Sequence, residues 1–132
     1  MAERGADART MHIGEVAERT ELSLRTLRHY DEVGLLRPSG RSEGGFRLYT
    51  EEDVEKLLVI RRMKPLGYSL EEMLQVMRLI EGLLGSGDTR PHRQQAAKLA
   101  ELIDEATLRR EQLARQLSMA DEFLDLLRDR AT

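Results

Sequence analysis

The stretch Ser23-Leu-Arg-Thr-Leu-Arg-His-Tyr-Asp31 decides the fold of the first half of the chain. It opens with a hydroxyl residue, a type that caps helices well. Leu24 and Leu27 stand three residues apart and can pack inward, and Tyr30 can lie with them or on the opposite face. The residues expected on the exposed face are Arg25, Thr26, Arg28 and His29. Hydrogen-bond donors on one face of a rigid helix suit the major groove of DNA, so the stretch predicts a recognition helix.

The neighbouring segments complete a helix-turn-helix. Ile13, Val16 and Ala17 recur at helical spacing and predict a short first helix, which a polar turn separates from Ser23. Gly34 suits the left-handed conformation that ends a helix, and a helix cannot continue through the proline that follows shortly after. Two short helices joined by such a turn form a helix-turn-helix, although this pattern alone is common.

A hairpin is expected directly after the recognition helix. The segment Arg41-Ser-Glu-Gly-Gly-Phe-Arg-Leu-Tyr49 reads as two short extended arms around a glycine pair. Arg41, Arg47 and Tyr49 lie on these arms. A hairpin with such residues in this position is typical of a wing that contacts a neighbouring groove or phosphates. For Arg41, a solvated loop position is the alternative.

Two further helices follow the hairpin. Thr50-Glu-Glu-Asp53 and Ser69-Leu-Glu-Glu72 both have the capping-box pattern that begins a helix, and the first of these helices should end before Pro65. Three methionines are expected in the core between the two helices, or else in an adaptable pocket for an apolar ligand. They are Met63, Met73 and Met77.

The C-terminal segment predicts a long helix that pairs with a second copy. Residues 1–10 are expected to be a disordered leader, and residues 82–91, rich in glycine, a flexible hinge. From His92 onward there is no glycine or proline, and residues 92–130 carry a heptad seam with one polar interruption. The seam residues expected to form a homodimer are Leu99, Ile103, Ala106, Arg110, Leu113 and Leu117. Arg110 could set the register by pairing with an acid of the partner helix. Ser118 can be read as a new cap, so a bend there and a short terminal helix are left open.

Charge and composition limit the possible functions. The 132 residues allow one domain, or a small domain with an extension, and the abundance of Leu, Ala, Glu and Arg favours helices. The net charge of −3 is unusual for a DNA-binding protein. From Leu24 to Tyr49, however, five arginines (Arg25, Arg28, Arg37, Arg41 and Arg47) outnumber three acids, which gives a local positive face.

Other classes of function find little support. The absence of cysteine excludes disulfides and thiolate metal sites, and the histidines His12, His29 and His92 are expected at the surface, so no cofactor or metal is expected. No signal or membrane segment is visible, which makes the cytoplasm the expected location and a membrane partner unexpected. No phosphate-binding glycine loop or nucleophile–base set is present, so no enzymatic activity is expected.

Taken together, these segments resemble the MerR family of bacterial transcription regulators. The matching segments are Ile13-Gly-Glu-Val-Ala17, Thr26-Leu-Arg-His-Tyr-Asp31, Gly34-Leu-Leu36, Gly45-Phe-Arg-Leu-Tyr-Thr50 and Leu66-Gly-Tyr-Ser-Leu-Glu-Glu72. The resemblance implies a mainly α fold, in which a winged helix-turn-helix domain (residues 11–81) is followed by a long dimerisation helix that forms an antiparallel coiled coil. It also implies a homodimer on pseudopalindromic double-stranded promoter DNA, which distorts the promoter spacer and so acts indirectly on RNA polymerase.

The resemblance assigns roles to individual residues. Arg25 and Thr26 would face bases, and Arg28 and Tyr30 would face phosphates. Arg47 and Tyr49 would be wing contacts, and Lys64 would be a phosphate contact from a second wing. The full candidate DNA-binding set is Ser23, Leu24, Arg25, Thr26, Arg28, His29, Tyr30, Arg41, Arg47, Tyr49 and Lys64. The turn departs from the family pattern, since Glu21 stands where glycine is usual, at a cost of about 1 kcal/mol if the backbone is left-handed there. The usual aromatic pair after the recognition-helix arginine is here His29-Tyr30.

Two questions stay open at this point. A small-molecule effector could be an apolar or uncharged ligand at the helix junction, or there could be none, with the regulator set by its own concentration. As an alternative function, the winged domain and long helix could serve as a protein-interaction adaptor or antirepressor that captures another regulator.

Overall fold

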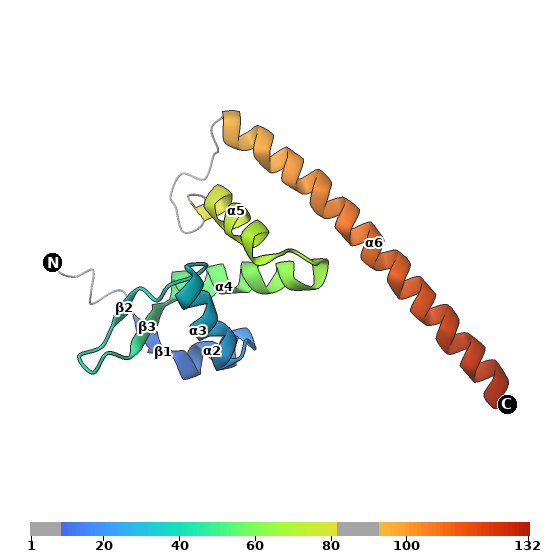
Figure 1. Cartoon of the computed structure of the whole chain (residues 1–132), viewed down its shortest axis with the longest axis horizontal. Helices are drawn as coiled ribbons and strands as arrows, with labels where there is room; N and C mark the ends of the chain where they lie inside the picture. The colour runs from blue at the N-terminus through green and yellow to red at the C-terminus, as the bar shows by residue number, and fades with distance from the viewer. Residues whose placement is uncertain (1–8, 82–92) are drawn as a thin grey trace. The chain divides into compact units, whose positions relative to one another are not determined.

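The structure is a computed structural model that describes residues 9–81 and 93–132. The chain divides into two compact units, one ending at Arg90 and the other beginning at Pro91, and each is described by itself. In their described residues, the first unit contains a small sheet and four α-helices, and the second contains one long helix (Figure 1).

The predicted helix-turn-helix consists of α2 (Ile13–Thr20) and α3 (Leu24–Val33). The Ser23 hydroxyl caps α3 by accepting a hydrogen bond from the Thr26 backbone N–H at 3.0 Å. Gly34 ends α3 in the left-handed conformation, at φ +80°. The turn between the helices is tight, because Glu21 also has a positive φ, +61°, and its N–H donates to the Ala17 carbonyl at 2.8 Å. Both helices and their ends are therefore confirmed.

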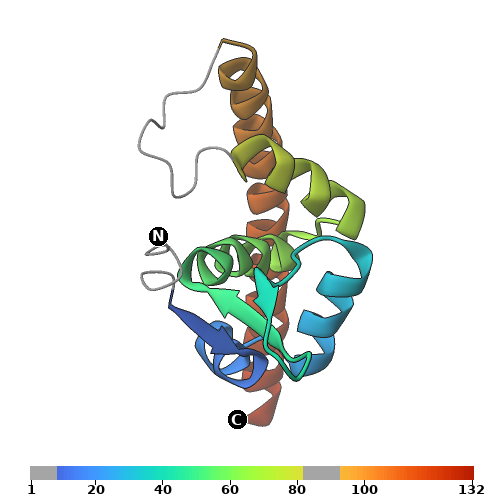
Figure 2. The same ribbon diagram turned by 90° about the vertical axis from the view of Figure 1, so that its left-hand side faces the viewer.

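A three-stranded antiparallel sheet lies next to the helix pair. It contains β1 (Thr10–His12), β2 (Gly40–Arg41) and β3 (Arg47–Thr50), and β3 lies in the middle (Figure 2). The β2–β3 hairpin confirms the predicted wing. The strand β1 was not predicted, and Thr10 had been assigned to the leader. Three residues are too few to show strand alternation, and β1 is held by its pairing with β3, in which Met11 lies opposite Tyr49. Of the predicted leader, Arg9 is exposed and in no regular element, and residues 1–8 lie outside the described residues.

The remaining helices of this unit pack against the helix pair, the central strand and one another. They are α4 (Glu51–Met63), the short 3-10 helix η1 (Lys64–Leu66) and α5 (Leu70–Ile80). Both predicted capping boxes are present, Thr50 with Asp53 and Ser69 with Glu72. The core is built mainly from β1, β3 and the four α-helices of this unit, and its largest fully buried apolar side chains are Tyr49, Leu27, Leu57, Ile60 and Val16. The three predicted core methionines, Met63, Met73 and Met77, are also buried.

The second unit is the helix α6 (Arg93–Ala131), which has 39 residues. At 1.5 Å per residue it is about 58 Å long. It runs through Ser118 without a break, so the structure has no separate terminal helix. The predicted hinge at residues 82–91 and the predicted first residue of the helix, His92, lie outside the described residues. None of the described helices is both long and apolar enough to cross a membrane.

Candidate nucleic-acid interface

The outer face of α3 carries exposed cations. Arg25, Arg28 and His29 are exposed, and within residues 9–81 and 93–132 neither arginine forms an ion pair. Thr26 is half-buried, and its Oγ1 accepts a hydrogen bond from the Ser23 hydroxyl at 2.9 Å. The two guanidinium groups are therefore available to a ligand such as a base edge or a phosphate.

Leu24 does not pack inward as expected. Its side chain, in the first turn of α3, is 40% exposed, whereas that of Leu27 is buried. An apolar side chain on this face can contact a thymine methyl group, so its place among the candidate DNA-binding residues stays a prediction.

The two tyrosines of the candidate set lie in the core. Tyr30 is 5% exposed, which selects the inward alternative and not the outer face of α3. Tyr49 is 0% exposed, and its hydroxyl has no hydrogen-bond partner among the described residues. Burial raises the pKa of both hydroxyls. The expectation that Tyr49 contacts DNA is contradicted, because the central strand β3 directs this side chain into the core.

The two wing arginines converge on one carboxylate that the sequence did not single out. Asp31, near the end of α3, accepts hydrogen bonds from Arg47 Nε at 2.8 Å and from an Arg41 terminal nitrogen at 3.2 Å. Another Arg41 nitrogen donates to the Gly45 carbonyl across the wing turn at 3.2 Å. Hydrogen bonding to Asp31 raises the pKa of Arg47. Arg41 is therefore part of an ion-pair network and not a residue of a solvated loop.

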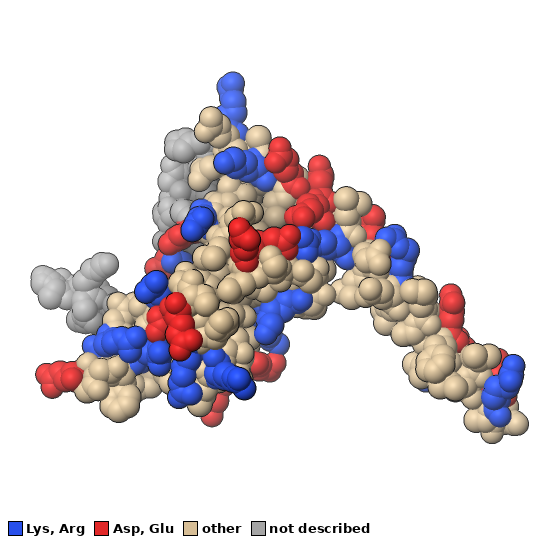
Figure 3. All heavy atoms as spheres, in the orientation of Figure 1, with Lys and Arg blue, Asp and Glu red and all other residues tan. Residues whose placement is uncertain are grey.

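Two other residues outside α3 are also exposed in the first unit. Lys64 is exposed at the start of η1, as a wing contact would require. Phe46, which was not in the candidate set, is 67% exposed on the wing, where its ring stands edge-on to His12 with centroids 6.3 Å apart. Figure 3 shows Lys and Arg side chains grouped over the wing end of the first unit, with acidic side chains among them. The local positive face inferred from the sequence thus contains carboxylates as well.

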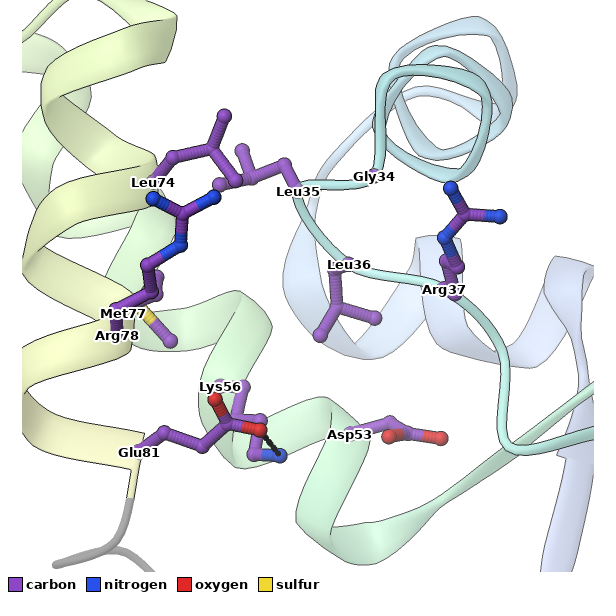
Figure 4. Close-up of a pocket in the computed structure, with 10 residues that line it drawn as sticks. All are labelled: Gly34, Leu35, Leu36, Arg37, Asp53, Lys56, Leu74, Met77, Arg78 and Glu81. Carbon is purple, nitrogen blue, oxygen red and sulfur yellow. Dashed lines mark ion pairs between the residues drawn. The ribbon is translucent and has the colours of Figure 1, made fainter.

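A hollow of about 330 Å³ lies between the end of α3, α4 and α5 (Figure 4). Leu35, Leu36, Leu74 and Met77 contribute apolar walls. Its other lining residues are charged: Arg37, Asp53, Lys56, Arg78 and Glu81. Lys56 pairs with Glu81 at 3.6 Å, and Asp53 accepts a hydrogen bond from Ser39 at 2.6 Å. This lining is more polar than a site for a purely apolar ligand would be.

Along α6 the predicted seam is largely uncovered in the single chain. Ile103 and Leu117 are 62% and 64% exposed, and Leu113 is also exposed. Arg110 is exposed, and it is the adjacent Arg109 that pairs within the helix, with Glu105 at 3.0 Å. Further apolar side chains outside the named seam are exposed as well: Leu108, Met119, Phe123 and Leu126. This much exposed apolar surface on one helix is typical of a surface that packs against another element.

No metal site is evident, since the described residues hold no group of three or more His, Cys, Asp or Glu side chains that could bind an ion.

Comparison with known proteins identifies the class. Residues 11–80, more than half of the chain, match the MerR HTH family of regulatory proteins. The protein therefore belongs to the MerR family of helix-turn-helix regulators.

Individual relatives are similar over different lengths. The chain is 44% identical over 69 residues to the uncharacterised HTH-type transcriptional regulator PA4778 of Pseudomonas aeruginosa, and the match spans 52% of each protein. The chain thus covers about half the length of that relative. It is 38% identical over 102 residues to the HTH-type transcriptional regulator YfmP of Bacillus subtilis, which covers 71% of this chain and 73% of YfmP.

A solved relative supports the architecture of the chain. The structure of HiNmlR, described as a MerR family regulator lacking the sensor domain and bound to promoter DNA, aligns with a TM-score of 0.64 at 27% identity. The alignment covers 92% of this chain and 87% of HiNmlR. The winged helix-turn-helix and the long C-terminal helix are therefore shared between the two proteins.

Proposed function

We propose that this protein is a cytoplasmic transcription regulator that binds promoter DNA as a homodimer and distorts the promoter spacer. The observation that carries the proposal is that Arg25 and Arg28, on the outer face of a capped recognition helix beside a hairpin wing, form no ion pair with any described residue. The promoter-bound state of HiNmlR supports it. In this account the protein has no enzymatic activity and affects RNA polymerase only through the shape of the promoter.

Within this proposal the candidate residues divide by role. Arg25 and Thr26 would read base edges, and Arg28 and Lys64 would bind phosphates. Ser23 would mainly hold the helix start, because its hydroxyl is engaged in capping. Leu24 and His29 would border the groove. We withdraw Tyr49 as a contact, and we assign Tyr30 to the core.

Dimerisation through α6 is the second part of the proposal. The exposed seam residues Ile103, Leu113 and Leu117 would be buried against a second copy in an antiparallel coiled coil. Two recognition helices held at a fixed distance would then read the two halves of a pseudopalindrome. Arg110, the exposed polar residue within the seam, could set the register.

For a small-molecule effector, the proposal gives a binding place and the general character of the ligand. The hollow between α3, α4 and α5 is a place where a small ligand could bind, and its charged lining favours a ligand with some polar character over a fully apolar one. Thermal-shift screening of apolar, uncharged and charged small molecules tests this branch. If no compound stabilises the protein, regulation by protein concentration alone becomes the preferred account.

The adaptor alternative is distinguished by DNA competition. Fluorescence anisotropy would compare a duplex from upstream of the protein's own gene with a random duplex of equal length. A regulator should prefer its own upstream DNA by at least about tenfold at physiological salt. Equal and weak binding to both duplexes would favour capture of another regulator.

A further inference from the structure

We infer that Asp31 is the residue that positions the wing of this protein on DNA. Asp31 itself would not touch DNA, and it would act by holding Arg47 and Arg41 in fixed orientations. This inference rests on the proposed function, and its tests include one that does not require DNA.

Asp31 and the two wing arginines form one cluster that joins two elements. Asp31 lies on α3, whereas Arg41 and Arg47 lie on β2 and β3 as directly paired residues of the hairpin. One oxygen of Asp31, Oδ2, accepts from both arginines, at 2.8 Å from Arg47 and 3.2 Å from Arg41. The carboxylate therefore ties both arms of the wing to the recognition helix.

The Asp31 side chain is 10% exposed and that of Arg47 is 23% exposed, whereas Arg41 is half-exposed. A buried carboxylate is costly unless it is paired, so Asp31 needs these arginines, and the network is screened less by salt than a surface ion pair would be.

Arg47 uses Nε toward Asp31, while its terminal nitrogens have no hydrogen bond to any residue in the described part of the chain. A guanidinium held by one edge presents its other donors in a fixed plane, which suits phosphate oxygens. Holding the side chain in advance also removes part of the entropy cost of ordering it on DNA.

The sign of a charge-removing substitution separates this role from its alternative. If Asp31 acted mainly as a negative charge near DNA, Asp31→Asn would strengthen binding by reducing repulsion of the phosphates. If Asp31 positions the wing, Asp31→Asn weakens binding, because the neutral amide holds the arginines less firmly. The two effects have opposite directions.

Glu32 provides the matched control. It is the next residue of the same helix and carries the same charge, and it is exposed and forms no ion pair among the described residues. We expect Asp31→Asn to weaken binding to the preferred duplex at least about fivefold and Glu32→Gln to change it less than about twofold. Asp31→Asn should also lower the magnitude of the salt slope by about 1, because part of the wing's phosphate contacts is lost. Asp31→Glu keeps the carboxylate and should therefore recover part of the affinity and part of the salt slope. Tighter binding by Asp31→Asn, or equal losses in the two charge-removing variants, would overturn the inference.

An NMR measurement on the wild-type protein keeps the test independent of variant stability. In the free protein the Arg47 Nε–H should exchange slowly with water, because it donates to a buried carboxylate. On addition of DNA this signal should persist at nearly the same position, whereas the Arg28 Nε–H signal should shift. Fast exchange of the Arg47 Nε–H in the free protein would contradict the inference whether or not DNA binds. If the Arg47 Nε–H exchanges slowly with water but the protein binds no DNA, the proposed function is wrong and the contact between Asp31 and the wing is still supported.

Discussion

The Glu21 carboxylate accepts a hydrogen bond from the Arg61 guanidinium at 2.7 Å, across 40 positions of sequence. Glu21 is the left-handed residue of the turn between α2 and α3, and Arg61 lies on α4. Glu21, which stands where the family usually has glycine, thus links the turn to α4 through an ion pair. Because both side chains are largely exposed, this ion pair offsets only part of the cost of a positive φ at a residue with a β-carbon.

The turn therefore offers a stability prediction. Glu21→Gly should be more stable than Glu21→Gln by about 1 kcal/mol, since both variants lose the ion pair and only the glycine removes the backbone strain. Urea unfolding of both variants, followed by circular dichroism, measures this difference. Equal stability would mean that the left-handed conformation at this position carries little strain.

The buried hydroxyl of Tyr49 leads to a second prediction. Tyr49→Phe should raise the free energy of unfolding by about 1 kcal/mol, because it removes a buried polar atom for which the described residues supply no partner. DNA affinity should stay within about twofold of wild type. A large loss of DNA affinity without loss of stability would reinstate Tyr49 as a DNA contact.

The two arginines of α3 should differ in what they contribute. Arg25→Ala should cost about 1 to 3 kcal/mol on the preferred duplex and relax the choice of base at particular positions. Arg28→Ala should weaken binding to all sequences to a similar degree. Binding measured on a set of single-base operator variants tests this division, and equal, sequence-independent losses from both substitutions would refute it.

The long helix gives a prediction about assembly. Leu113→Asp should yield monomers that bind the operator much more weakly, because a charge in the seam cannot be buried without a partner. Gln112→Asp adds the same charge on the neighbouring position outside the seam and should leave the dimer intact. Sedimentation velocity distinguishes these outcomes, and a dimeric Leu113→Asp variant would show that the seam is assigned incorrectly.

Sequence reasoning predicted most of the fold because the signals were local. Ser23, Thr50 and Ser69 cap helices through contacts with residues three positions away, and Gly34 ends α3 through its own backbone. The strand β1 escaped detection because its pairing with β3 joins residues about 40 positions apart. Local patterns carry no information about such pairing.

The candidate site was predicted less completely than the fold. Arg25 and Arg28 lie on the exposed face as expected, since helical spacing determines which side they occupy. Tyr49 was misplaced because the hairpin pattern does not show which face of a short strand meets the core. Asp31 was missed because its role depends on two arginines that approach it from another element. The sequence contained only a weak signal for it, because Asp31 is one of two adjacent acids near the end of α3 and nothing local distinguishes it from Glu32.

The proposed function requires that this protein bind DNA through phosphate contacts from α3, which a salt series of binding measures. Binding to the duplex from upstream of its own gene would be measured by anisotropy between about 50 and 200 mM salt, for wild type and for Arg28→Ala. We predict a steep linear fall of log affinity with log salt concentration, with the slope reduced by about 1 to 2 in the variant dimer, and preference over random DNA throughout. A flat salt response, or identical slopes for the two proteins, would contradict the account.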